Sequence, residues 1–278
     1  MIRYDAVTDT WCAPLKLDPK DIGNINQVAV DRAGNAVVVW LGRDGMKSFR
    51  FRIATGRWSP TQTIQKIDNV LTTRPSVAVS RTGYAMVTWG QRGVGTVVSR
   101  FNAYTNTWTP VRFLEKAPAN QDEAIYDIQD ALIAVDDAGN ATPAWFRWDE
   151  SVYNSVHRIS ASRYNVATNS WSAPRTMSAP NTFVEQLSVA MDRLGNGFVM
   201  WGSNGMNGWA VSHVARYVAQ TSQWQQSAVV QDDPAAMTLS SNIVAGPNGS
   251  AVAIWSEEID IANSRYAVRV DQLGPIGH

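Results

Sequence analysis

Residues 131–145 read ALIAVDDAGNATPAW, and residues 28–40 and 187–201 spell close variants, VAVDRAGNAVVVW and LSVAMDRLGNGFVMW. In each stretch, two short apolar runs flank a turn that contains Asp and Gly. Such a pattern is typical of a β-hairpin, because Gly accepts positive φ at little cost. Five copies of the phrase place a tryptophan six residues after the turn glycine, at Trp40, Trp89, Trp145, Trp201 and Trp255.

A second phrase alternates with the first. It reads RYDAVTDTWCAP, RFRIATGRWSP, RFNAYTNTWTP, RYNVATNSWSAP and RYVAQTSQW, with tryptophans at Trp11, Trp58, Trp108, Trp171 and Trp224. Each copy pairs a strand that ends near Arg with a strand that begins near Trp, so it predicts a second hairpin. Two hairpins make four antiparallel strands, and one unit of this size is typical of a propeller blade. We therefore predict a single all-β domain over residues 1–278, a β-propeller of five four-stranded blades.

The chain ends predict how the ring closes. The last repeat stops after SRYAVRVD without a Trp phrase, and Trp11-Cys12-Ala13-Pro14 supplies one at the other end. We expect residues 1–19 to complete the last blade, because closure removes open sheet edges. Residues 1–5 also duplicate a strand at 265–270, which leaves six blades or a partial propeller as alternatives.

Composition narrows the function classes. Lys+Arg and Asp+Glu are both 24, and a nucleic-acid binder usually has a basic excess. No apolar run approaches the roughly 20 residues of a membrane-spanning helix. Cys12 is the single cysteine, and His157 and His213 lie outside any metal-binding spacing, so we expect no disulfide, metal or cofactor.

The N-terminal sequence MIRYDAVTDTW lacks the basic and then apolar pattern of a signal peptide. The chain is therefore either cytosolic or begins after a removed leader. We favour a secreted or cell-surface location with the leader removed.

The phrase from Asp31 to Ala36 and its copies resemble the Asp-box, or sialidase-type, repeats of bacterial β-propellers. The blade count is similar to that of five-bladed sugar-binding lectins of the tachylectin type. The resemblance implies a propeller architecture. It does not imply sialidase activity, because the Trp lies farther from its Gly than in the usual Asp box and no arginine triad with a Tyr–Glu pair is recognisable.

Most repeated residues have a structural interpretation. Asp31, Asp136 and Asp192 occupy one turn position, where Asp can accept hydrogen bonds from backbone amides. The ten repeated tryptophans are expected to pack in the core and between blades. Cys12 occupies a Ser or Thr position of its phrase and is expected to be a small packed side chain.

The repeat is interrupted around blade three. The segments FRWDESVYNSVHRIS (146–160) and FLEKAPANQDEAIYDIQD (113–130) are longer than their counterparts. In an up-and-down topology both insertions map to the face opposite the Asp–Gly turns. Trp148 and Trp209, the two tryptophans outside the repeat, also fall in loops of this face. We expect them either to stack on a ligand or to fold over their own loops.

Polar residues on this face complete the predicted ligand site. The residues that flank the two tryptophans are Arg147, Asp149, Glu150, Asn204 and Asn207. The channel ends of the first strands add Arg74, Asp130, Gln186 and Glu185.

The leading hypothesis is a non-catalytic propeller that binds a carbohydrate or another polar polymer, a glycan or a protein ligand, through one asymmetric face. The loops on this face differ between blades (LGRDGM, GQRGVG, FRWDES, GSNGMN, SEEIDI), which argues against five equal sites. One alternative is a five-bladed glycoside hydrolase with Asp130 and Glu185 as its carboxyl pair and Asp149 and Glu150 in reserve. The other is a protein-interaction scaffold.

Overall fold

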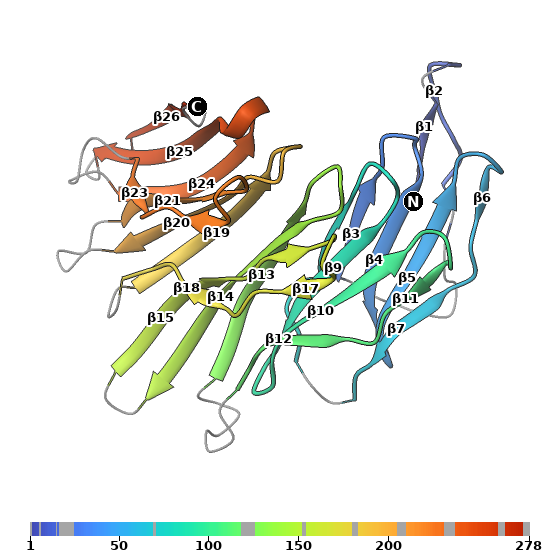
Figure 1. Cartoon of the computed structure of the whole chain (residues 1–278), viewed down its shortest axis with the longest axis horizontal. Coiled ribbons are helices and arrows are strands. Elements are labelled where there is room, and N and C mark those ends of the chain that lie inside the picture. The colour runs from blue at the N-terminus through green and yellow to red at the C-terminus, as the bar shows by residue number, and fades with distance from the viewer. Residues whose placement is uncertain are drawn as a thin grey trace.

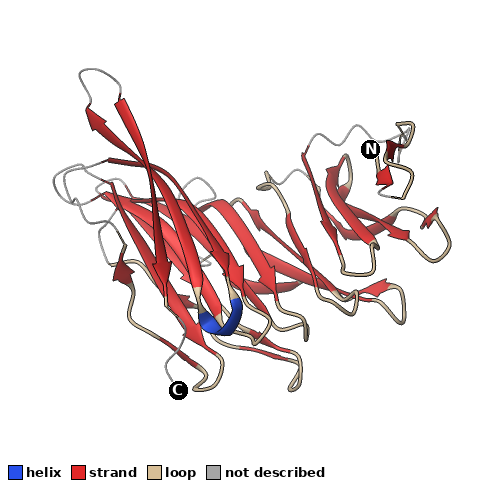
Figure 2. Cartoon of the chain, turned by 90° about the horizontal axis from the view of Figure 1, so that it is seen from above, coloured by secondary structure: helices blue, strands red, loops and turns tan. Residues whose placement is uncertain are grey.

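The structure is a computed structural model. It describes all residues except 1, 6, 15, 17–24, 69–70, 118–125, 152–153, 180–182, 205–209, 231–236, 261–264 and 275–278. The described part is built from antiparallel strands, and its only helical element is the single turn η1 (Pro247–Gly249). Figure 2 shows this composition, which confirms the predicted all-β class.

Five sheets follow one another along the chain (Figure 1). Sheet 1 contains β3 (Ile25–Val30), β4 (Ala36–Gly42), β5 (Gly45–Arg52), β6 (Arg57–Trp58) and β7 (Gln62–Lys66). Sheet 2 contains β8 (Ser76–Val79), β9 (Ala85–Gln91), β10 (Gly95–Asn102), β11 (Thr107–Trp108) and β12 (Arg112–Lys116). Sheet 3 contains β13 (Tyr126–Val135), β14 (Ala141–Ser151), β15 (Asn154–Ala161), β16 (Tyr164–Asn165), β17 (Ser170–Trp171) and β18 (Arg175–Thr176). Sheet 4 contains β19 (Phe183–Met191), β20 (Gly197–Asn204), β21 (Ala210–Val218), β22 (Gln223–Trp224) and β23 (Ala228–Val229). Sheet 5 contains β24 (Met237–Ala245), β25 (Ala251–Asp260) and β26 (Arg265–Leu273).

The fourth strand of sheets 1 to 4 is broken into two short pieces. In sheet 1, β5 pairs first with β6 and then with β7. Pro60 lies between these pieces and has no backbone N–H to donate, so a continuous ladder is interrupted there. Pro110 and Pro174 hold the same place in sheets 2 and 3.

The five sheets stack on one another in chain order. The first strands β3, β8, β13, β19 and β24 contact one another in chain order. Each pair of neighbouring sheets encloses an apolar cluster. Four tryptophans of the first phrase lie within these clusters, and their exposed fractions are Trp89 0%, Trp145 0%, Trp201 1% and Trp255 5%. The fifth, Trp40, is 6% exposed and stacks on Phe49 of its own sheet. The predicted structural role of these tryptophans is confirmed.

The Asp–Gly turns are held by side-chain hydrogen bonds. Asp192 Oδ1 accepts from the amides of Leu194 and Asn196 at 2.9 Å, and Oδ2 accepts from Asn196 Nδ2 at 2.7 Å. The amide of Gly249, in the turn of the next sheet, also donates to Oδ2 at 2.7 Å. Asp31 and Asp136 make the corresponding bonds within their own turns. The turn aspartates are therefore structural, as predicted.

The arginines that open the second phrase join neighbouring sheets. Each guanidinium lies over an aromatic ring of the following sheet, in a cation–π arrangement. The pairs, with distances to the ring centroid, are Arg50 over Phe101 at 5.0 Å, Arg100 over Tyr164 at 5.1 Å and Arg163 over Tyr217 at 4.2 Å. The arginine is thus a repeated inter-sheet contact, a role that the sequence interpretation did not assign.

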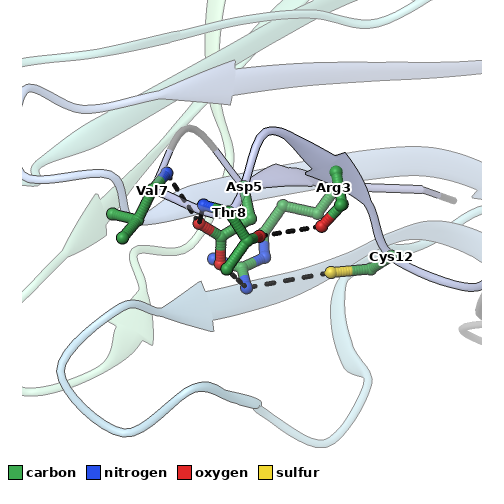
Figure 3. Close-up of polar contacts among 6 residues, drawn as sticks. Arg3, Asp5, Val7, Thr8 and Cys12 are labelled. Atoms are coloured by element: carbon green, nitrogen blue, oxygen red, sulfur yellow. Dashed lines mark hydrogen bonds and ion pairs between the residues drawn. The ribbon is translucent and has the colours of Figure 1, made fainter.

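The N-terminal residues form a separate hairpin of β1 (Tyr4–Asp5) and β2 (Thr10–Trp11). Asp5 Oδ1 accepts from the amides of Val7 and Thr8, and the Cys12 amide donates to the Arg3 carbonyl at 2.8 Å (Figure 3). The latter bond corresponds to the one from the Ser59 amide to the Arg50 carbonyl. This hairpin is therefore a copy of the second phrase.

The hairpin does not complete the last blade, and this part of the predicted closure is wrong in the structure. Among the described residues, β1 and β2 pair only with each other and β26 pairs only with β25. The Arg3 guanidinium lies over the Phe51 ring at 5.3 Å, so the hairpin packs on sheet 1. The hairpin of β1 and β2 and the last strand β26 lie at opposite ends of the row of sheets (Figure 1).

Two further expectations fail at the same hairpin. Trp11 is 64% exposed and contacts Tyr4, because no other sheet covers it. Cys12 is exposed rather than packed, with its sulfur 3.9 Å from the Arg3 guanidinium.

Candidate functional site

The two faces predicted from the topology are confirmed by hydrogen bonds between turns. Asn35 Oδ1, in the first turn of sheet 1, accepts from the amide of Ile53 in the turn after β5. Asn140 with Val166 and Asn196 with Ala219 repeat this link. Turns of the two phrases therefore share one face, the turn face. Connections from second to third strands lie on the opposite face, the insertion face.

The insertion in sheet 3 lengthens strands rather than forming a loop. β14 spans 11 residues, compared with 7 for β9 and 8 for β20. Its pairing with β15 continues to Ser151 and Asn154. Trp148 therefore lies within a strand and not in a loop, which corrects the sequence interpretation.

Trp148 packs on a histidine of the neighbouring strand. Its ring centroid lies 5.1 Å from that of His157, and Phe146 lies 5.4 Å from the same imidazole. His157 is 3% exposed, and its Nδ1 lies 3.3 Å from the Val184 carbonyl oxygen of sheet 4. Trp148 itself remains partly exposed. The hairpin thus fixes one side of the indole ring and leaves part of it open to solvent.

Arg147 does not flank Trp148, because successive side chains of a strand point to opposite faces. Its guanidinium forms an ion pair with Glu115 of β12 at 2.5 Å. Glu115 also accepts a hydrogen bond from Trp145 Nε1 at 2.5 Å. The arrangement joins sheets 2 and 3, so Arg147 has a structural role.

Asp130 lies in the middle of β13, and Arg74 lies two residues before β8. Asp130 pairs with Phe146 across β13 and β14, and both Asp130 and Arg74 are exposed residues. Partial desolvation of its carboxyl group raises the pKa of Asp130, and the charge of Arg74 opposes that rise. The charge of Arg74 therefore acts on the carboxyl group of Asp130.

The structure places the backbone, but not the side chains, of several other predicted residues. Asp149 and Glu150 lie in β14, Glu185 in β19 and Asn204 in β20. Asn207 and Trp209 lie outside the described residues.

Two features of this face were missed by sequence reasoning. The first strands carry bulges, and the register shifts between Ile128 and Asp130, between Glu185 and Leu187, and between Thr238 and Ser240. Gln186 sits in the second of these with φ of 58°. Bulges of this kind re-aim side chains next to them. Alternation of apolar residues gives no signal for such an extra residue.

The other missed feature is a polar pair in sheet 4. His213 stacks on Trp201 with ring centroids 5.4 Å apart, and its Nε2 lies 2.7 Å from Ser203 Oγ. Burial lowers the pKa of His213. An isolated histidine in the sequence gave no indication of this contact.

The described residues hold no group of three or more His, Cys, Asp or Glu side chains arranged to bind a metal ion. No helix in this part of the molecule is long and apolar enough to cross a membrane.

Comparisons with known proteins show a likeness in fold. No protein-family model matches the chain, and no curated protein matches it by sequence. A protein of unknown function from Dyadobacter fermentans has a TM-score of 0.54 at 10% identity, with 91% of this chain and 79% of that chain covered. The polysaccharide lyase Uly1 has a TM-score of 0.54 at 9% identity, with 94% and 71% covered. An ulvan lyase with a bound saccharide has a TM-score of 0.56 at 11% identity, with 96% and 76% covered. At these identities the likeness concerns the arrangement of sheets.

Proposed function

We propose that this protein is a non-catalytic β-propeller that binds a carbohydrate or another polar polymer through its insertion face. In this proposal the five sheets are the blades and their Asp–Gly turns are Asp-box-like repeats of a bacterial type. The single observation that carries the proposal is the partly exposed Trp148 ring held on His157 by a lengthened hairpin. Similar structures that include polysaccharide lyases are compatible with it.

The position of Trp148 suits a stacking contact. Its backbone is fixed in β14, which pairs with β13 on one side and β15 on the other. His157 supports the ring and is itself held by Phe146, so binding costs little additional side-chain entropy. The exposed part of an indole ring offers a large apolar surface on which a sugar ring can stack.

In this proposal charged groups from two neighbouring sheets supply polar contacts. Asp130 offers a carboxyl group and Arg74 a guanidinium, both at exposed residues. A few convergent polar groups beside an apolar surface are typical of small-molecule sites. Asp149, Glu150, Asn204, Asn207 and Trp209 extend the proposed site.

The proposal is tested with a glycan array followed by titration of the best ligand. Trp148→Ala should weaken binding at least about 30-fold, because a truncated aromatic anchor costs 2 kcal/mol or more. Trp209→Ala should also weaken it. Tyr104→Ala is the matched control, because Tyr104 is an 82% exposed aromatic residue on the turn face. Equal affinity of Trp148→Ala and the unaltered protein, or a ligand located over the Asp–Gly turns, contradicts the proposal.

A glycoside hydrolase is the second candidate, since the raised pKa of Asp130 is what a general acid requires. We expect no turnover of chromogenic glycosides that depends on this residue. Hydrolysis that disappears in Asp130→Asn or in Glu185→Gln would favour the enzyme over the binding protein.

A further inference from the structure

Two sheet faces at the ends of the row expose apolar side chains. On sheet 1, Val28 and Val30 of β3 are 56% and 60% exposed. Val28 stands six residues before its turn glycine, as Ile133 and Ile243 do in sheets 3 and 5. Those two residues are only 7% and 2% exposed, because the preceding sheet covers them. The front face of a sheet is the face that packs on the preceding sheet. On the front face of sheet 1, the part formed by β3 is therefore an exposed copy of a surface that is buried elsewhere, whereas Trp40, Phe49 and Phe51 on the same face are only 5–6% exposed.

The rear face of a sheet is the face that packs on the following sheet, and the rear face of sheet 5 is exposed in the same way. The apolar side chains on this face come from all three strands and include Val244, Val252, Ile254, Tyr266, Val268 and Val270. Val252 and Ile254 stand at the same distances after their turn glycine as Phe198 and Met200 of sheet 4. Both of the latter residues are 0% exposed, because sheet 5 covers them. Sheet 5 thus presents the surface that every other sheet buries against its successor.

These two faces are complementary by repetition. Four successive sheet pairs in the chain bury a rear face against a front face, and each pair forms one apolar cluster. We propose that the rear face of sheet 5 in one copy of the chain packs on the front face of sheet 1 in a second copy. Such a head-to-tail contact leaves one free face at each end and forms rings or filaments.

The N-terminal hairpin makes the front of sheet 1 specific for a three-stranded sheet. Arg3 already lies over Phe51, in the place that Arg50 takes over Phe101. The hairpin therefore occupies the outer position of a sheet in front of sheet 1. Sheet 5 has three strands among its described residues and lacks this outer hairpin. Gln272 and Leu273 of β26 pair with Val252 and Ala251 of β25. In the other sheets this place in the third strand is held by the arginine and the aromatic residue that open the second phrase. Docking therefore requires Gln272 and Leu273 to leave β26, so that Arg3 and Tyr4 of the second copy lie beside β25 in their place.

The test is the concentration dependence of sedimentation of the full chain. The unaltered protein should associate as its concentration rises. Val268→Lys and Val28→Lys should each raise the apparent dissociation constant at least ~10-fold, because each buries an ammonium group in an apolar contact. Leu194→Lys adds the same charge at a 57% exposed residue of the turn face and should associate like the unaltered protein.

Mixing the two lysine variants identifies the geometry. Each variant keeps one intact face, so an equimolar mixture should form 1:1 dimers and nothing larger. A monomeric unaltered protein at all concentrations overturns the proposal, whether the chain closes on itself or another protein covers the faces. Association that Val268→Lys removes and Val28→Lys does not touch also overturns it, because that pattern indicates sheet 5 packed on a second sheet 5.

Discussion

The turn face repeats its side chains, whereas the insertion face changes them from sheet to sheet. On the turn face, Asp31, Asp136 and Asp192 make the same hydrogen bonds. On the insertion face of sheets 2 to 5, the residue two places after the buried tryptophan differs in each sheet and has a different partner. These pairs are Gln91 with Gln65, Arg147 with Glu115, Ser203 with His213 and Glu257 with Arg269.

The difference follows from what each side chain must satisfy. A turn aspartate bonds to backbone amides, and backbone donors stand in the same place in every repeat. A side chain that bonds to another side chain can be exchanged together with its partner. Repetition therefore marks backbone constraints, and sequence divergence is tolerated where side chains pair with each other.

The largest expected effect comes from deleting one buried side chain of the core that lies between the two faces. Trp89→Ala should lower the free energy of unfolding by about 3–5 kcal/mol, because it deletes a large side chain that is 0% exposed. Urea denaturation measures this loss. Trp11→Ala is the control and should change stability by less than about 0.5 kcal/mol, because Trp11 is 64% exposed. Similar losses for the two variants would contradict the packing described for the repeated tryptophans.

A smaller loss of stability is expected from removing a turn side chain, and it should be greater for a charged side chain than for a neutral one. Asp192→Ala should cost about 3 kcal/mol, because it orphans buried amide donors that bond to a carboxylate. Ser80→Ala should cost only about 1 kcal/mol, since the Ser80 hydroxyl accepts one amide bond, from Tyr84 at 3.2 Å. Urea unfolding of both variants checks the order. An Asp192→Ala protein as stable as Ser80→Ala would show that the repeated carboxylate is not needed.

The smallest expected effect lies on the insertion face and depends on pH. Burial lowers the pKa of His213, so the unfolded state binds more protons as the pH falls through the ordinary histidine value. The free energy of unfolding should therefore be constant above that value and decrease below it. His213→Gln should flatten this decrease when both proteins are unfolded in urea between neutral and mildly acidic pH. Parallel curves would indicate that His213 titrates normally.

The N-terminal hairpin shows where sequence reasoning stopped. The phrase from Arg3 to Trp11 correctly predicted a hairpin, because the Asp5 turn and the Cys12 amide bond are local. Its partner sheet was predicted wrongly. The Arg3–Phe51 contact joins residues far apart in the sequence, and a repeat offers several equivalent aromatic rings.

The sequence by itself determined the all-β class, the order of strands, the turn aspartates and the buried tryptophans. All of these depend on periodicity and on bonds between residues that are close along the chain. Only the tertiary structure decided that Trp148 rests on His157, that Arg147 pairs with Glu115, and that the end sheets expose Val28 and Val268. These contacts depend on which sheet lies opposite which, and that choice is set by packing across the whole molecule rather than by any local pattern.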